Sequence, residues 1–292
     1  MAIRKFREEE AAAYGRRAAL ASCRKLLEWA NQAPNRRPDD EYIHELRVRL
    51  RRARASMRAF RRYYPSRTDF DRRMRPLRRL ARALGPMRDA DVTASVFTEV
   101  LRNTPYPPRA VVSLLTRHHA LQEQRWLRVR PALEAVRGLK PSDLAPPPGQ
   151  KGAGRSLSKH ARRQLLTRLD DVWAHRTAWK TRGPTDLHAL RIEVKRLRYT
   201  VETFDRLLGE AGAQWGERLR ELQSVLGLVN DHTVALVVVH RAEAQATAGL
   251  ERAGLELVER IVEGRRGAHV ARAAEVWASI DIKALRRLIR GL

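Results

Sequence analysis

The side chains most suited to chemistry are histidines and basic residues that recur at one fixed spacing. The first copy consists of His44, Arg47, Arg51 and Arg54, followed by Arg58. The second copy, displaced by 144 residues, consists of His188, Arg191, Lys195 and Arg198. Arginine forms planar, bidentate hydrogen bonds to phosphate oxygens and stays charged. The pattern therefore indicates that phosphate groups bind along one face of a helix.

The same spacing extends beyond the charged residues as an internal repeat. Phe60 recurs as Phe204 at the offset of 144 residues, whereas Asp89 recurs as Asp231 at an offset of 142. The change of offset indicates a connection that is two residues longer in the first half of the chain. A repeat of this length predicts two similar structural units.

Apolar residues recur every three or four positions, which is the helical period, and no convincing alternating runs occur. We therefore expect an all-α protein of two similar helical bundles, the first over residues 1–140 and the second over residues 155–292. Residues 141–154 contain three consecutive prolines and three glycines, and they are expected to form a linker that neither a helix nor a strand can cross. Residues 105–108 separate two helical stretches in the first half.

On a helix over residues 44–60, the cations occupy about 80° of arc at 100° per residue. A neighbouring apolar stripe about 100° wide is the face that packs into the bundle. This stripe consists of Ile43, Leu46, Leu50, Ala53, Met57 and Phe60. Because the two stripes are adjacent, packing the apolar stripe leaves the cations at the edge of the interior, where they can line a groove between helices.

A solvated helix face is the ordinary alternative for such a run of charge, but it normally mixes the two signs. Like charges at i and i+4 destabilise a helix by a few tenths of a kcal/mol per pair. Arg47, Arg51, Arg54 and Arg58 are such neighbours, with no acid between them. We infer that an external polyanion offsets this repulsion.

A second cationic helix is expected downstream of residue 70. Its arginines follow helical spacing and are Arg72, Arg75, Arg79 and Arg82. Residues 44–88 carry sixteen arginines and three acids, so their charge of +13 is half of the protein's total of +26. This concentration of charge makes the first repeat the expected centre of anion binding.

Local signals predict that this second helix ends at Gly85-Pro86. Pro76 either kinks the helix or begins a new one as its first residue. Asp89 is then expected to cap the following helix by accepting backbone N–H groups, and Asp231 supports the same role in the second repeat.

The whole chain has 292 residues, with 59 Lys and Arg against 33 Asp and Glu, and its hydrophobic fraction of 43% is enough for a folded core. The single cysteine, Cys23, excludes an internal disulfide and a cysteine-based zinc cluster, which fits a reducing compartment. The start of the sequence lacks a secretory signal, and the longest apolar run, residues 234–239, is far shorter than the roughly 20 residues of a membrane span. We expect a cytoplasmic protein that does not bind membranes.

The histidines leave three roles open. His44 and His188 could contact phosphate, cap their helices or bind a metal. His118 and His119 are adjacent, so their side chains diverge by about 100° and cannot share a metal from one helix face. No Gly-rich phosphate loop, Ser/His/Asp set or Cys/His pair occurs, and carboxylates are scarce along the cationic stripes. We expect neither an enzyme nor a resident metal or cofactor.

The segments HELRVRLRRAR at residues 44–54 and LHALRIEVKRLRY at residues 187–199 resemble the signature of the CHAD domain, the conserved histidine α-helical domain. The segment RDADV at residues 88–92 resembles the motif that follows the family's second helix. The resemblance covers essentially the whole chain. It implies two pseudo-symmetric four-helix bundles that flank a basic groove or pore, and it implies that this groove binds inorganic polyphosphate.

The second repeat departs from the first at several of the basic positions. The substitutions are Glu202 for Arg58, Glu221 for Arg79 and Ser224 for Arg82. Residues 188–206 therefore carry a charge of only +2, against +7 for residues 44–62. We expect binding to be weighted toward the first repeat.

The leading hypothesis is a non-enzymatic cytoplasmic protein that binds inorganic polyphosphate and is associated with polyphosphate granules. Phosphate or sulfate would occupy the same positions in crystals. The residues expected to contact phosphate are His44, Arg47, Arg51, Arg54, Arg58, Arg79, Arg82, His188, Arg191, Lys195 and Arg198.

Two alternatives remain open from the residues. A nucleoid-type protein would bind nucleic acid through the same charge, although the first stripe lacks the interleaved aromatic residues that stack single-stranded bases. A scaffold would instead dock proteins through its outer helices, as the basic, amphipathic residues 282–290 suggest.

Overall fold

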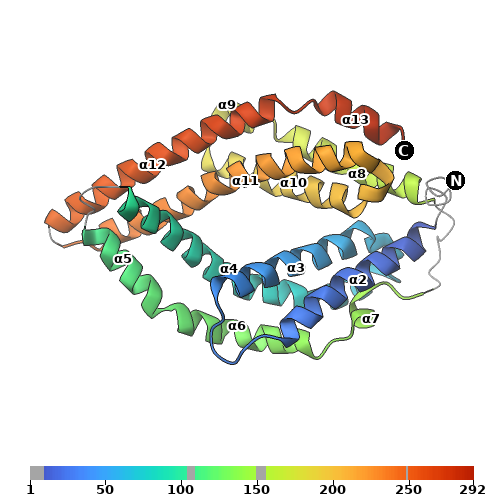
Figure 1. The fold of residues 1–292 in the computed structure, drawn as a ribbon, viewed down its shortest axis with the longest axis horizontal. Coiled ribbons are helices and arrows are strands. Elements are labelled where there is room, and N and C mark those ends of the chain that lie inside the picture. The colour runs from blue at the N-terminus through green and yellow to red at the C-terminus, as the bar shows by residue number, and fades with distance from the viewer. Residues whose placement is uncertain (1–9, 104–108, 149–155, 248) are drawn as a thin grey trace.

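The computed structural model describes residues 10–103, 109–148, 156–247 and 249–292, which fold mainly into helices (Figure 1). Within these ranges the only extended pairing is an isolated bridge between Glu10 and Ser156. The longer helices are α2 (Ala11–Asn31), α3 (Asp40–Ala59), α4 (Arg67–Arg102), α6 (Gln122–Arg137), α8 (Leu157–Ala174), α10 (Pro184–Thr203), α11 (Asp205–Glu243) and α12 (Gly249–Ala278). The shorter ones are η1 (Arg61–Tyr63), α5 (Arg109–Ala120), α7 (Pro141–Leu144), α9 (Ala178–Thr181) and α13 (Ile282–Arg290). The prediction of an all-α protein is confirmed.

The repeated sequence signature lies on α3 and α10, two helices of 20 residues each. The side chain of Asp39 starts α3 by accepting a hydrogen bond from the backbone N–H of Tyr42, at 2.7 Å, whereas Pro184 supplies the first turn of α10. Both helices end at the repeated phenylalanine, with φ of −110° at Phe60 and −114° at Phe204. The offset of 144 residues therefore relates the bounds of these helices as well as their sequences.

Helix α4 continues without a break through both Pro76 and Pro86. The prediction that it ends at Pro86 was wrong, and Asp89 lies inside the helix instead of capping the next one. An interior proline removes a hydrogen bond and costs about 3 kcal/mol. The helix continues because its apolar face stays buried on both sides of the proline, at Leu84 and Met87.

Asp231 likewise lies inside α11, so its predicted capping role was also wrong. The first turn of α11, which begins at Asp205, is separated from the rest of the helix by Gly209. Gly209 has φ of +61° and ψ of −151°, which a residue with a side chain adopts only with strain. In the first half, the longer connection between α3 and α4 contains η1.

The predicted linker is partly helical, because residues 141–144 form α7. Pro141 occupies the first position of this helix, where its missing N–H costs no hydrogen bond. Leu144 is buried, and its carbonyl accepts a hydrogen bond from the hydroxyl of Tyr64 at 2.9 Å. Helix α7 ends at Leu144 and does not cross the segment, while residues 149–155, and residues 104–108 in the earlier turn, lie outside the described residues.

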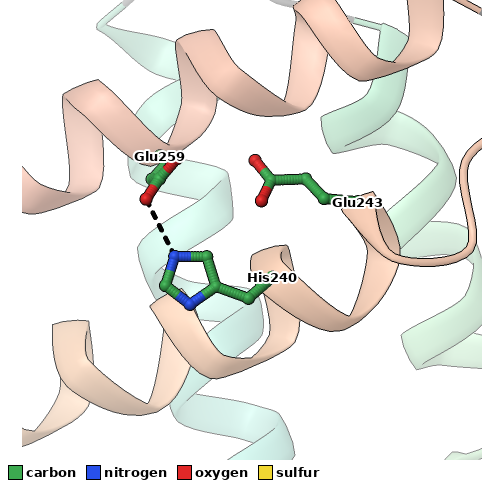
Figure 2. Close-up of side chains that lie close together, drawn as sticks. All are labelled: His240, Glu243 and Glu259. Atoms are coloured by element: carbon green, nitrogen blue, oxygen red, sulfur yellow. Dashed lines mark hydrogen bonds and ion pairs between the residues drawn. The ribbon is translucent and has the colours of Figure 1, made fainter.

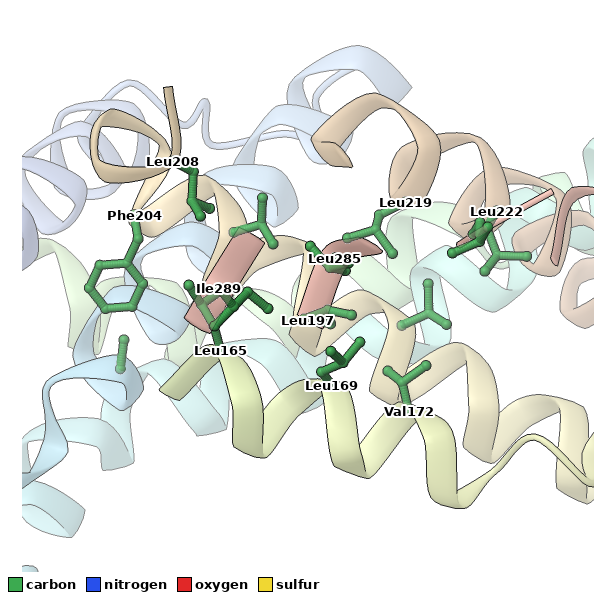
Figure 3. Packing of buried hydrophobic residues seen from close by; sticks show 14 of the residues in the cluster. Leu165, Leu169, Val172, Leu197, Phe204, Leu208, Leu219, Leu222, Leu285 and Ile289 are labelled. Atoms are coloured by element: carbon green, nitrogen blue, oxygen red, sulfur yellow. The ribbon is translucent and has the colours of Figure 1, made fainter. Parts of the chain in front are cut away.

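Buried apolar side chains of the described residues form three clusters. One lies mainly among α2, α3, α4 and α6, and a second among α8, α10, α11, α12 and α13, where α8 and α10 side chains meet α11 and α13 (Figure 3). The third joins the far ends of α4 and α11 to α5 and α12, at the left of Figure 1. Phe60 and Tyr63 of the first half belong to the second cluster, so the two halves of the chain share parts of their cores.

Helix α11 is the one helix in the described part of the chain that is long and apolar enough to cross a membrane. The longest uninterrupted apolar run, residues 234–239, did not indicate such a helix, because polar residues separate the apolar positions of α11. Core helices of soluble proteins meet the same criteria. Here α11 packs against α4, α10 and α12, and Leu219, Leu222 and Leu226 are fully buried.

The ends of α3 and α10 meet in an aromatic contact. The rings of Phe60 and Phe204 lie 5.6 Å apart, and the ring of His160 stacks on Phe60 at 5.1 Å. His160 Nε2 donates a hydrogen bond to the carbonyl of Ala59 at 2.9 Å. On the other side, α2 approaches Phe60 at Gly15, where an added Cβ would lie 2.4 Å from the ring. This junction fixes how α2, α3, α8 and α10 meet.

We predict that Gly15→Ala destabilises the protein by about 1–3 kcal/mol, because the methyl group forces Phe60 out of its stacked position. Gly267→Ala is the matched control, since nothing lies within 4 Å of its added Cβ inside α12. That substitution should stabilise by about 0.5–1 kcal/mol, the ordinary gain for alanine in a helix. Urea unfolding of the three proteins measures both changes, and equal effects would show that α2 does not require the close approach.

Candidate functional site

Two open cavities lie between the two repeats and meet at Arg51 of α3 and Lys195 of α10. The first cavity has a volume of about 490 Å³ and is lined by residues of α3, α4, α10 and α11. The second cavity has a volume of about 550 Å³ and is lined mainly by α3, α4, α8 and α10. Because both cavities share these two side chains, an extended anion could contact the same cations from either side.

Most of the predicted site residues lie at these cavities. Those lining the first cavity are His44, Arg47, Arg51, Arg191 and Lys195. Those lining the second cavity are Arg51, Arg54, Arg58 and Lys195. The structure therefore brings together basic residues that lie more than 130 positions apart in the sequence.

Four predicted residues line neither cavity. Arg79 and Arg82 are exposed on α4. His188 is exposed, and its Nδ1 lies 2.8 Å from Oδ1 of Asn230. Arg198 is buried and is held by neighbouring side chains.

Helix α3 presents its cations at the cavities because its apolar side chains face the core. Leu46, Ala53 and Met57 are fully buried. Arg47 and Arg51 lie beside this face and are partly covered. Packing of the apolar stripe thus removes these guanidinium groups from most, but not all, of the solvent.

Hydrogen-bond donors in the cavities lack acceptors. The Nε atoms of Arg51 and Arg54 are shielded from solvent and have no hydrogen-bond partner. Arg47 is partly satisfied, since its Nη1 donates to the carbonyl of Leu84 at 2.7 Å. An unpartnered buried donor costs about 1–3 kcal/mol, so an anion that accepts these N–H groups would recover that free energy.

Burial and mutual repulsion lower the pKa values of these arginines. Burial, followed by repulsion from Arg88 and Arg51, lowers the pKa of Arg47 to about 10. Burial lowers the pKa of Arg54 in the same direction, with further repulsion from Arg78. These guanidinium groups nevertheless remain charged at neutral pH, so they retain their attraction for anions.

Lys195 responds most strongly to this environment. Burial, followed by repulsion from Arg191, Arg51 and Arg88, lowers its pKa to about 7. The charge of Lys195 therefore changes near neutral pH. A bound anion would favour the protonated form and raise this pKa.

The second repeat uses several charges within itself. Arg198 donates to Oε1 of Glu202 at 2.6 Å and to Oε1 of Gln223 at 2.8 Å. Glu221, another acidic substitution, pairs with Arg272 at 3.0 Å. Because Glu202 stands where the first repeat has Arg58, the replacement removes one cation and engages another.

Several cavity residues were absent from the sequence-based site. Arg88 lines the first cavity and pairs with Asp231 at 3.2 Å, so the two repeated segments around positions 89 and 231 meet across the site. The resemblance to the RDADV motif was the signal that could have identified Arg88. Four further arginines line the second cavity only because α4, α8, α10 and the α3–α4 connection pack around α3. These are Arg61, Arg78, Arg168 and Arg196 in the second cavity.

Carboxylates limit the positive charge at the outer end of the first cavity. Asp40 and Asp91 both line it, and Asp91 lies 3.6 Å from Arg37. Burial, followed by repulsion from Asp40, raises the pKa of Asp91. The positive charge is therefore greatest toward the junction of the cavities and in the second cavity.

A family model for the CHAD domain matches residues 18–240. The chain belongs to the CHAD domain family. The match includes the signatures on α3 and α10 and most of the long helices α4 and α11.

Two solved structures share the fold of this CHAD domain protein. The crystal structure of the CHAD domain from the plant Ricinus communis is 18% identical, with a TM-score of 0.59 over 98% of this chain and 93% of the plant chain. PptA from Streptomyces chartreusis is 15% identical, with a TM-score of 0.62 over 93% of this chain and 100% of the other. No curated protein sequence matches the chain.

We predict that Lys195→Met removes a rise of stability with pH. Because its pKa of about 7 lies below the ordinary lysine pKa of 10.5, folded Lys195 is neutral between these two values, while the lysine of the unfolded chain keeps its proton. Unfolding then takes up a proton, so stability rises with pH by up to about 1.4 kcal/mol per unit. In urea unfolding, the wild-type protein should gain stability over the variant from pH 7 to 9, and the difference should be flat below pH 6.

Lys180→Met, at an exposed lysine on α9, serves as the control and should show no such difference. The prediction would be contradicted if the free energy of unfolding of the wild-type protein and of Lys195→Met changed in parallel across this pH range.

Proposed function

We propose that this protein binds inorganic polyphosphate in the two joined cavities and carries out no reaction on it. The observation that carries the proposal is the junction at Arg51 and Lys195, where cations from both repeats share one space. The CHAD signature implies the same ligand, and the unpartnered Nε donors of Arg51 and Arg54 are suited to its oxygens.

We further propose that the two repeats form pseudo-symmetric bundles on either side of a basic pore. The matching bounds of α3 and α10 support this arrangement, as do the paired ends at Phe60 and Phe204. The joined cavities would be the pore, with α3 supplying most of its charge and α10 completing the opposite wall.

Binding in this site is electrostatic and follows from the chemistry of its cations. Phosphate oxygens would accept hydrogen bonds from the unpartnered Nε–H groups of Arg51 and Arg54. Their negative charge would also offset the repulsion among the guanidinium groups. Lys195 would take up a proton as its neighbours' repulsion is balanced. Polyphosphate affinity should therefore increase as the pH falls toward 6.

The size of the cavities favours a thin, flexible anion over a duplex. Volumes of about 490 and 550 Å³ admit a few phosphate units but exclude double-stranded DNA. A duplex would touch only the rims, where Arg58 and Arg196 are exposed. It would leave the buried cations of the junction without partners.

We predict that charge reversal at the junction weakens polyphosphate binding far more than duplex binding. The variant Arg51→Glu/Arg54→Glu should lose at least a hundredfold in polyphosphate affinity, since each lost charge-assisted hydrogen bond costs about 1.5–3 kcal/mol. Its salt dependence should flatten by about one unit for each lost phosphate contact. Titrations with short polyphosphate and duplex DNA at equal phosphate concentration, over several salt concentrations, measure both.

The control is Arg109→Glu/Arg128→Glu, which reverses two exposed arginines away from both cavities. Equal losses in the two variants would point to diffuse electrostatics without a site. If the wild-type protein prefers DNA at physiological salt, the nucleic-acid function replaces the proposal.

We predict that the two repeats contribute unequally. The matched pairs are Arg47→Gln/Arg51→Gln and Arg191→Gln/Lys195→Gln, which all line the first cavity. The first pair should cost more affinity at pH 7.5, because Lys195 is largely neutral before binding. Isothermal titration calorimetry with short polyphosphate, with and without a chelator, measures the difference.

Both double variants should bind polyphosphate more weakly than the wild-type protein. The chelator should leave the affinity of each protein unchanged, since arginine needs no metal ion to neutralise phosphate. A second-repeat pair that behaves like the wild-type protein would argue against a shared pore. Loss of binding on chelation would restore the metal role considered for His44 and His188.

A further inference from the structure

Three potential metal ligands converge where α11 and α12 meet, away from the two cavities. His240 and Glu243 lie one turn apart on α11, and Glu259 approaches from α12 (Figure 2). One ligand atom from each side chain lies within 4.8 Å of the other two. Positions i and i+3 share one face of a helix, which explains why both α11 residues face Glu259.

The charges in this cluster are poorly balanced by the protein. His240 Nε2 lies 2.8 Å from Oε1 of Glu259. Oε1 of Glu243 is shielded from solvent and has no hydrogen-bond donor. Among the described residues, neither Glu243 nor Glu259 forms an ion pair with an arginine or lysine, although the chain has 59 of these basic residues.

A further acid close to the cluster is already engaged. Glu263 lies close enough to His240 for the two to interact electrostatically. Its carboxylate oxygens accept hydrogen bonds from Arg266 at 2.6 and 2.8 Å, which lower its pKa. Arg266 is thus engaged by Glu263, and among the described residues no arginine or lysine pairs with Glu243 or Glu259.

We propose that His240, Glu243 and Glu259 bind a divalent first-row transition metal ion, of which Zn²⁺ is the best fit. One imidazole nitrogen and two carboxylate oxygens are ligands that Zn²⁺ accepts, with water at the remaining position. Small side-chain rotations would bring each ligand atom to the bond length of about 2.0–2.2 Å. The ion would satisfy Oε1 of Glu243 and offset the repulsion between the two carboxylates.

The imidazole ligand separates this site from a magnesium or calcium site. Mg²⁺ and Ca²⁺ prefer oxygen ligands, whereas imidazole nitrogen favours zinc and its neighbours. The site is also separate from anion binding, because none of its three ligands lines either cavity. Its function would be to clamp the far end of α11 to α12, beside the third apolar cluster.

The sequence predicts no metal at His44, His118, His119 or His188, because these histidines lack the spacing of metal ligands. The usable signal was His240-x-x-Glu243, which places two ligands on one helix face. Glu259 could not be added from the sequence, since its position opposite His240 depends on how α12 folds back on α11.

The test is zinc titration of the tag-free, chelator-treated protein by calorimetry at pH 7, with Glu243→Gln as the principal variant. Glu243→Gln removes a ligand whose Oε1 has no hydrogen bond to lose, so the fold should persist. Wild-type protein should bind one Zn²⁺ here, and the variant should bind it at least tenfold more weakly. Glu251→Gln, an exposed acid earlier on α12, should bind like the wild type.

His240→Asn should lose the site entirely, and Mg²⁺ should not compete. A second measurement needs no variant: Co²⁺ should give the visible absorption of a tetrahedral or five-coordinate site, and one equivalent of Zn²⁺ should abolish it. Equal zinc affinity in wild type and Glu243→Gln, or an octahedral Co²⁺ spectrum, would overturn the proposal. Unchanged polyphosphate binding on zinc removal is expected, so this result is independent of the proposed function.

Discussion

The structure depends on holding two like-charged helices side by side. Cations of α3 and α10 converge at Arg51 and Lys195, where burial, followed by their mutual repulsion, lowers the pKa of Lys195 to about 7. Apolar contacts at the two ends of the cavities oppose that repulsion. Phe60 and Phe204 join the helix ends on one side, and the third cluster joins α4 and α11 on the other. The cations therefore remain close together without being neutralised by the protein itself.

This constraint also explains the difference between the repeats. If both helices carried the full set of cations, the junction would gain still more repulsion. The second repeat instead places Glu202 opposite Arg198, which forms an internal ion pair within α10. The first repeat keeps Arg51 and Arg54 with unpartnered donors. One wall of the site thus supplies available charge, and the other supplies a more neutral, hydrogen-bonded surface.

The two proposed sites use opposite chemistry at separate places on the same helices. The junction of the cavities holds the unpartnered donors of Arg51 and Arg54, whereas the cluster at His240 holds carboxylates that pair with no arginine or lysine among the described residues. Helix α11 connects them, since it lines the first cavity at Asp231 and carries His240 further along. A metal clamp would therefore fix the far end of the helix without contacting the anion.

The sequence by itself determined the helical period, the repeat and the adjacent apolar and cationic stripes, because these depend only on local spacing. It accordingly predicted α3 and α10, and most of the site residues it predicted line the cavities. It was wrong at Pro86, where burial of Leu84 and Met87 outweighed the local signal for a break. Only the tertiary structure decided that Arg88 and Lys195 share a cavity, that Arg198 also donates to Gln223 of α11, and that Glu259 faces His240. Those outcomes depend on contacts between helices distant in the chain, and no local spacing encodes them.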